Sequence, residues 1–207
     1  MKTHSIFLSA QRPFPEAHTK PNAMTIDTSV IQLHDKQFKK LVTRDQIAHA
    51  VRRLAAQITQ DYNGNEVVFV VVLKGSFLFA ADLLREVTLP CTVEFIRAES
   101  YGALMHSSGT VSITHYTGQD LAGKHVVILE DIVDTGLTVR RIVTHLQNMN
   151  PMSLAIATLF FKPDVCRGTV EPKYVGFEIS PLFIVGYGLD YNELGRNLAD
   201  VYVLHTS

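Results

Sequence analysis

The 207-residue sequence is poor in several features that mark particular classes of protein. Its two cysteines, Cys91 and Cys166, show no CxxC or Cys-His spacing, which argues against a disulfide framework and a structural zinc site. The longest apolar run is far shorter than the roughly 18 residues that a membrane helix needs. The 19 basic and 20 acidic side chains leave a net charge of −1, which offers no case for binding nucleic acid or membranes. We therefore expect a globular protein that binds neither.

Residues 1–28 differ in character from the rest of the chain. Pro13, Pro15 and Pro21 stand there among polar residues, with no period of 2 or 3.6. The short apolar stretch Ile6-Phe7-Leu8 is not long enough for a secretory signal. We expect an N-terminal tail that lies on the surface or stays disordered, followed by one domain over residues 29–207, in a cytoplasmic protein.

Beyond the tail, helical and strand patterns alternate. Thr43-Arg44-Asp45-Gln46 has the form of a capping box and predicts a helix over 44–60. Val67 to Leu73 is an unbroken apolar run rich in β-branched residues, typical of a strand covered on both faces. Periodicity predicts further helices over 77–87 and 138–148, and strands over 92–96, 125–129, 154–161 and 183–185. This order indicates an α/β fold with a doubly wound, mostly parallel sheet flanked by helices, in which ligands bind beyond the carboxyl ends of the strands.

One segment at such a strand end combines three carboxylates with a turn of small residues. Glu130, Asp131 and Asp134 come just before Thr135-Gly136, and a helix follows. Hydroxyl groups and free backbone amides at a helix N-terminus suit a phosphate. Carboxylates would repel a phosphate, so we expect them to hold a divalent cation, accept hydrogen bonds from hydroxyls or act as a base. In a purely structural alternative, Asp134 or Thr135 only caps the helix.

The segment from Val126 to Thr138 resembles the phosphoribosyl-pyrophosphate motif of the type I phosphoribosyltransferases. Four further segments narrow the resemblance to the hypoxanthine/guanine branch: Leu73-Lys74-Gly75-Ser76, Ser100-Tyr101-Gly102, Phe161-Lys162-Pro163 and residues 185–193. The resemblance covers residues 30–205. It implies the type I phosphoribosyltransferase fold, with a small hood from the N- and C-terminal segments. It also implies a purine-salvage transferase that moves the phosphoribosyl group of 5-phosphoribosyl 1-pyrophosphate (PRPP) to hypoxanthine and/or guanine, with Mg²⁺ as cofactor, giving IMP or GMP and pyrophosphate.

The resemblance also implies a role for particular residues. Glu130 and Asp131 would lie against the ribose hydroxyls, and Asp134 would face purine N7 as general base. The 5′-phosphate would be held by Asp134, Thr135, Gly136, Leu137 and Thr138. The pyrophosphate would be bound by Lys74, Gly75 and Arg196, and the purine by Lys162, Phe183, Ile184 and Asp190. The metal ligands would be Glu130, Asp131 and Asp190.

Two further implications concern loops. The Leu73-Lys74 peptide is often cis in this family. Ser100 and Tyr101 would begin a mobile lid whose closure keeps water from the reacting ribose.

Without the resemblance, several of these residues have ordinary structural readings. Lys162 would be a surface lysine, and Asp190 with Arg196 would be a solvated ion pair. Lys74-Gly75 would be a plain strand-to-helix turn. Phe183 and Ile184 would be core residues, and the segment that begins at Ser100 would be an ordinary hairpin loop.

Other features limit the resemblance or compete with it. Gly118 to His125 nearly spells a nucleotide P-loop, but it ends in His and precedes a strand, so we reject that interpretation. Leu194-Gly195 stands before Arg196 where the family commonly has a bulky aromatic residue, which questions the placement of Arg196. A noncatalytic regulator with this fold is the rival function, although such a protein tends to lose the residues matching Lys162 or Asp134. A preference for xanthine stays open, and the family's assemblies favour a homodimer or homotetramer.

Overall fold

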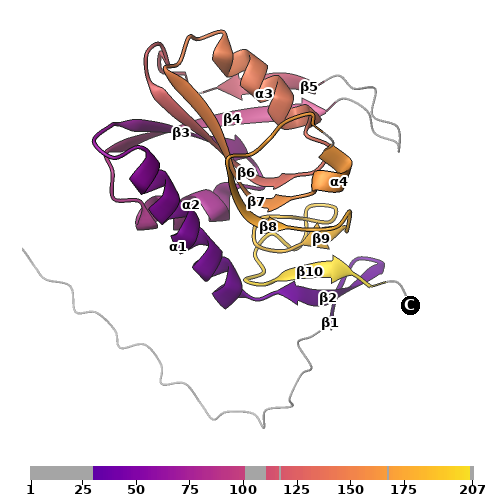
Figure 1. The fold of residues 1–207 in the computed structure, drawn as a ribbon. Coiled ribbons are helices and arrows are strands. Elements are labelled where there is room, and N and C mark those ends of the chain that lie inside the picture. Colours follow the sequence, from indigo (N-terminus) through magenta and orange to yellow (C-terminus); the bar gives the residue numbers. More distant parts are fainter. Residues whose placement is uncertain (1–29, 101–110, 117, 167, 206–207) are drawn as a thin grey trace, which may run out of the picture.

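The computed structural model describes residues 30–100, 111–116, 118–166 and 168–205, which form a six-stranded and a four-stranded β-sheet (Figure 1). The strands of the larger sheet, in spatial order, are β5 (Val111–Tyr116), β4 (Cys91–Ser100), β3 (Val67–Leu73), β6 (His125–Val133), β7 (Ser153–Phe161) and β8 (Tyr174–Glu178). All neighbours pair in parallel except β4 and β5. The expected mostly parallel α/β sheet is confirmed.

Helices cover both faces of this sheet, which explains the unbroken apolar run of β3. Val67, Phe69 and Val71 share one buried cluster with α1 (Arg44–Asp61) and α2 (Phe77–Glu86). Val68 and Val70, which point to the opposite face, share a second cluster with α3 (Leu137–Gln147). A short helix, α4 (Pro163–Cys166), follows β7. Among the helices of the described ranges, none is long and apolar enough for a membrane crossing.

The predicted capping box at the start of α1 is present. The Thr43 amide donates to Gln46 Oε1 at 2.9 Å, and the Gln46 amide donates to Thr43 Oγ1 at 3.3 Å. These two reciprocal bonds satisfy amides that the first helical turn cannot pair. They fix where the helix begins beneath the sheet.

The smaller sheet is antiparallel and joins the two ends of the described chain. Its strands, in spatial order, are β1 (Val30–Leu33), β2 (Lys36–Val42), β10 (Val201–Leu204) and β9 (Ile184–Val185). Phe38, Val185 and Tyr202 form its own buried cluster. This sheet matches the small hood that the resemblance implies, and it lies beside the ends of β7 and β8 (Figure 1).

Two sequence-based predictions about strands were wrong. Residues 183–185 were expected to give the fifth strand of the parallel sheet, but Ile184 and Val185 pair with β10 in the hood. The fifth parallel strand is β8, which contains Gly176 and no long apolar run. A Cβ on Gly176 would lie 2.5 Å from the carbonyl oxygen of Leu159, so the tight approach of β7 requires glycine there.

The third predicted strand, 125–129, is also longer than expected. β6 continues to Val133, paired with Phe161 at the end of β7. Glu130 and Asp131 therefore lie within the strand rather than after it. Acidic residues are uncommon in strands, so the prediction ended this strand four residues too early.

Candidate active site

The sequence-predicted site residues meet at the carboxyl edge of the parallel sheet. Lys74 follows β3, Asp134 follows β6 and Lys162 follows β7, while Asp190 and Arg196 come from the loop between β9 and β10. Since the carboxyl ends of parallel strands meet at one edge, residues far apart in the chain become neighbours.

Lys162 and Asp134 form an ion pair, with 2.9 Å between Lys162 Nζ and Asp134 Oδ2. The lysine side chain is only 8% exposed, whereas the aspartate side chain is 50% exposed. The Lys162 amide also donates to the Val133 carbonyl at 3.0 Å, which fixes the lysine beside the end of β6. Because a buried ammonium is stable only with a partner, Lys162 is no ordinary surface lysine.

The turn after β6 is shaped to present backbone amides. Gly136 is the N-cap of α3 and has φ +77°, a left-handed conformation that favours glycine. A Cβ at this position would lie 2.8 Å from Cys166 Sγ, so the end of α4 supports the turn from behind. Asp134 binds Lys162 instead of capping the helix, while Thr135 Oγ1 accepts a long 3.4 Å bond from the Leu137 amide. The free amides at this helix start suit an anion such as a phosphate.

Glu130 and Asp131 are buried carboxylates on β6, 8% and 9% exposed. Burial, and then the neighbouring Asp131, raise the pKa of Glu130 well above its usual range. Burial also raises the pKa of Asp131 to about 6, although the Ile132 amide at 2.8 Å and the Arg196 charge act in the opposite direction. Glu130 Oε2 is buried and has no hydrogen-bond partner. Such an acceptor is suited to a hydroxyl group or a cation.

These carboxylates do not amount to a preformed metal cage. Within the described part of the chain, no group of three or more His, Cys, Asp or Glu side chains is arranged to hold a metal ion. Mg²⁺ sites on phosphate substrates use only one or two protein carboxylates, together with substrate oxygens and water. The residues therefore fit a magnesium ion that arrives with its substrate better than one held by protein alone.

The loop between β3 and α2 packs directly against the Asp131 carboxylate and the backbone at Gly188. The Leu73-Lys74 peptide is cis, as the resemblance implied. A Cβ on Gly75 would lie 1.7 Å from Asp131 Oδ2, and one on Gly188 would lie 2.0 Å from the Gly75 carbonyl oxygen. Lys74 Nζ extends from this loop to both carboxylate oxygens of Glu193, each at 3.0 Å.

The loop between β9 and β10 places Arg196 beside these groups. Arg196 Nη1 donates to the Gly188 carbonyl at 2.9 Å, and its Nη2 lies 2.7 Å from Asp190 Oδ1. Gly195 has φ +102° and faces Leu33 of the hood, which fills space beside the loop. Arg196 thus has definite partners even though Leu194-Gly195 departs from the family pattern.

The expected purine-binding residues differ in exposure. Phe183 is 46% exposed, and its ring centroid lies 6.2 Å from that of Phe38 and 5.9 Å from that of Tyr191. The Ile184 side chain is buried in the core, so only its backbone can face a ligand. Because β9 is the edge strand of the hood, one side of that backbone is unpaired within the sheet.

The expected lid falls largely outside the described residues. Ser100 is the last residue of β4, and Tyr101 lies beyond the described range. Sequence reasoning had assigned no role to Glu193, the partner of Lys74. Glu193 is distinguished by its backbone conformation, with φ +68°. This conformation cannot be recognised from the sequence, so the sequence offered no signal for it.

Comparison with known proteins supports the interpretation of this site. Residues 39–192 match the family model described as a phosphoribosyl transferase domain. The hypoxanthine-guanine phosphoribosyltransferase of Mycobacterium tuberculosis is 41% identical over 170 residues, which cover 79% of this chain and 84% of that protein. A hypoxanthine phosphoribosyltransferase structure from Staphylococcus aureus has a TM-score of 0.77 and 40% identity, with 81% of this chain and 91% of that chain covered.

A crystal structure of a hypoxanthine-guanine phosphoribosyltransferase from Bacillus anthracis has a TM-score of 0.74 and 38% identity. The alignment covers 80% of this chain and 97% of the Bacillus anthracis chain. The family model covers every strand of the six-stranded sheet, together with β9 and part of β2 of the hood. The chain therefore belongs to the phosphoribosyl transferase family, in its hypoxanthine-guanine phosphoribosyltransferase branch.

Proposed function

We propose that this enzyme transfers the phosphoribosyl group of PRPP to N9 of hypoxanthine or guanine, giving IMP or GMP and pyrophosphate. The observation that carries the proposal is the buried Lys162 ammonium 2.9 Å from Asp134, beside the amide-rich turn at Gly136. An ammonium donates only, and the O6 atom of a 6-oxopurine accepts only, so this lysine selects the oxo group. Asp134, half-exposed beside it, would take or share the N7 proton as N9 attacks C1 of the ribose.

The remaining residues hold the donor substrate and its leaving group. The turn from Asp134 to Thr138 would bind the 5′-phosphate, and the buried carboxylates of Glu130 and Asp131 would accept hydrogen bonds from the ribose hydroxyls. Lys74, Gly75 and Arg196 would bind the pyrophosphate. Phe183 would stack on the purine, and the Ile184 backbone would face the edge of the base. Catalysis then depends mainly on positioning and on stabilising the charge that develops on pyrophosphate as the bond to C1 breaks.

The charges of the site support Mg²⁺ as cofactor. Without Glu130, whose pKa is raised by burial, four carboxylates, those of Asp131, Asp134, Asp190 and Glu193, stand against three cationic side chains, those of Lys74, Lys162 and Arg196. A pyrophosphate group would meet net negative charge there unless a cation came with it. Asp131 and Asp190, with Glu130, are the residues that would hold the ion, which supplies electrostatic stabilisation of the leaving group.

We propose further that the enzyme acts in the cytoplasm, on small molecules alone, and as a homodimer or homotetramer. Cys91 and Cys166 are both free thiols, as a reducing compartment requires. Val93 and Phe95 lie on the same face of β4 and are 37% and 40% exposed. They provide apolar surface on which a second copy of the chain could pack. Size-exclusion chromatography with light scattering would test the oligomeric state.

The deciding experiment supplies PRPP and MgCl₂ with hypoxanthine, guanine, xanthine or adenine in separate reactions and measures nucleotide and pyrophosphate. We expect turnover with hypoxanthine or guanine, little with adenine, and loss of turnover in excess EDTA that added MgCl₂ restores. Undiminished turnover in EDTA would exclude the metal requirement. Absence of a product with every purine would overturn the proposed function and favour the regulator.

A further inference from the structure

The turn that carries Glu193 is unusual for its sequence. Tyr191 and Leu194 exchange two backbone hydrogen bonds, at 2.9 and 3.1 Å, around a two-residue turn formed by Asn192 and Glu193. Both central residues have positive φ, +47° and +68°. Such turns favour Asn at the first central position and Gly at the second, because L side chains resist this conformation. Glutamate therefore occupies a position where glycine would be more stable.

The side chain at this position reaches the cations proposed to bind pyrophosphate. Both Glu193 oxygens lie 3.0 Å from Lys74 Nζ, and Oε2 lies 3.7 Å from Arg196 Nη2. The Glu193 amide donates to Asp190 Oδ2 at 2.8 Å, which orients the turn toward these groups. The hydrogen bond from Lys74, and then its charge, lower the pKa of Glu193, so the carboxylate is ionised at neutral pH.

We infer that Glu193 is an internal anion that occupies the cationic groups of the pyrophosphate site in the free enzyme and is displaced when pyrophosphate or PRPP binds. The inference rests on the proposed function, which makes Lys74 and Arg196 the pyrophosphate ligands. A carboxylate with two oxygens near Lys74 is the same kind of acceptor that a phosphate group presents. The ligand must therefore replace an existing ion pair rather than find a free ammonium.

Exposure decides how strong this competition is. The Lys74 and Glu193 side chains are 50% and 68% exposed, so water screens their attraction. A buried pair would prevent binding, whereas an exposed pair weakens it by a factor of about two to five. Glu193 thus sets the affinity for pyrophosphate without closing the site, which favours release of the product.

The test is calorimetric titration with inorganic pyrophosphate in excess MgCl₂ at fixed ionic strength. We expect Glu193→Gln and Glu193→Gly to bind it about two- to fivefold more tightly than the wild type. The glycine variant suits the turn, so it keeps the test valid if the glutamine variant folds poorly. Glu66→Gln removes the same charge at the opposite edge of the sheet, where Glu66 is exposed, and should bind like the wild type.

Glu193→Asp separates occupation of Lys74 from simple repulsion. Aspartate keeps the charge and tolerates positive φ, but it is one methylene shorter, so it reaches Lys74 less well. We expect it also to bind pyrophosphate more tightly than the wild type, whereas binding equal to the wild type would reduce Glu193 to a repelling charge and overturn the inference. Equal or weaker binding by both the glutamine and glycine variants would overturn it too. Failure of the wild type itself to bind pyrophosphate would instead overturn the proposed function on which the inference rests.

Discussion

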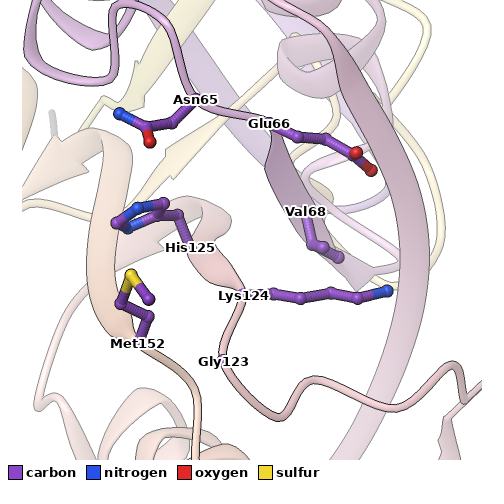
Figure 2. A pocket seen from close by; sticks show the side chains of 7 residues that line it. All are labelled: Asn65, Glu66, Val68, Gly123, Lys124, His125 and Met152. Atoms are coloured by element: carbon purple, nitrogen blue, oxygen red, sulfur yellow. The ribbon is translucent and has the colours of Figure 1, made fainter.

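The two edges of the six-stranded sheet both carry charged side chains, yet they differ in how those side chains are partnered. The pocket at the amino edge has a volume of about 310 Å³ and includes Lys124 and His125 at the start of β6 (Figure 2). Lys124 Nζ donates to Gln119 Oε1 at 2.7 Å, and His125 Nδ1 lies 2.7 Å from Ser153 Oγ. At the carboxyl edge, by contrast, Glu130 Oε2 is buried without a partner.

The carboxyl edge is thus distinguished by its buried ionisable groups rather than by an open volume. At the amino edge, the Lys124 and His125 side chains each have a hydrogen-bond partner, and the nearby Met152 is 67% exposed. At the carboxyl edge, burial raises the pKa of Asp131 to about 6, and Lys162 is buried beside a carboxylate. Groups held in such costly states are typical of catalytic sites. The following experiments test this comparison, beginning with the largest expected effect.

Replacing Asp134, at the carboxyl edge, with Asn should lower kcat more than any other substitution considered below. The substitution keeps the shape of the side chain but removes the carboxylate proposed to take the N7 proton, and general-base catalysis contributes typically about 10²- to 10⁴-fold. Steady-state kinetics with varied PRPP would show a much larger change in kcat than in KM. A loss of less than about fivefold, well below that range, would make Asp134 part of the phosphate turn only.

Lys162→Gln should cost less and should change specificity. Hydrogen bonds to a charged group contribute about 1.5–3 kcal/mol, so kcat/KM for hypoxanthine should fall on the order of 10- to 100-fold. The glutamine amide can also accept, so discrimination against adenine should weaken. The comparison requires both purines at saturating PRPP with wild type and variant. If neither the rate nor the hypoxanthine-to-adenine ratio changes, Lys162 does not read the base.

Asp131→Asn should stabilise the protein at neutral pH while lowering turnover. The folded protein raises the pKa of Asp131 from 3.8 to about 6, so it binds the proton more tightly than the unfolded chain does. Stability therefore falls as pH rises between these values, and the loss is complete above them. At pH 7.5 the variant should gain on the order of 2–3 kcal/mol in free energy of unfolding.

The pH dependence provides the control for that measurement. Near pH 3.5 both forms carry a neutral side chain, so the advantage of the variant should disappear when unfolding is followed across a pH series. An advantage that is the same at acidic and neutral pH would mean that packing, rather than the buried charge, is responsible.

Lys124→Gln at the amino edge should have the smallest effect. Loss of its bond to Gln119 should lower the free energy of unfolding by about 1 kcal/mol. Both kcat and KM should stay within twofold of the wild type, because Lys124 lies at the edge opposite to the proposed chemistry. A larger change in KM for PRPP would contradict the contrast between the edges and give the pocket in Figure 2 a functional role.

Local patterns predicted the helices and the inner strands well, because each has a strong period or an unbroken apolar run. The prediction failed where sheet membership depends on distant partners. Ile184 and Val185 look like any short strand, and only pairing with β10 places them in the hood. The edge strand β8 escaped because Gly176, which the contact with β7 requires, weakens its pattern.

For the site, Asp134 and Lys162 were accessible through the resemblance because their segments are distinctive. Their mutual contact, and the pairing of Lys74 with Glu193, could not be predicted, since these residues are far apart in the chain. The raised pKa of Asp131 likewise depends on burial within β6 rather than on neighbouring letters. The residues that meet at this edge could thus be predicted, whereas their electrostatic states required the three-dimensional arrangement.

The contact of Gly75 with Asp131 and of Gly188 with Gly75 has a consequence for inherited variation. Three stretches of chain meet there with no room for a single methyl group, since added Cβ atoms would lie 1.7 and 2.0 Å from their neighbours. Alanine at Gly75 would displace the Asp131 carboxylate, and alanine at Gly188 would push against the backbone of Gly75. In a library of all single-codon changes, Gly75 and Gly188 should therefore be intolerant positions beside more permissive exposed residues. Selection at these two codons would exclude any side chain for lack of space. A survey of variants could therefore locate the centre of the enzyme without any assay of its chemistry.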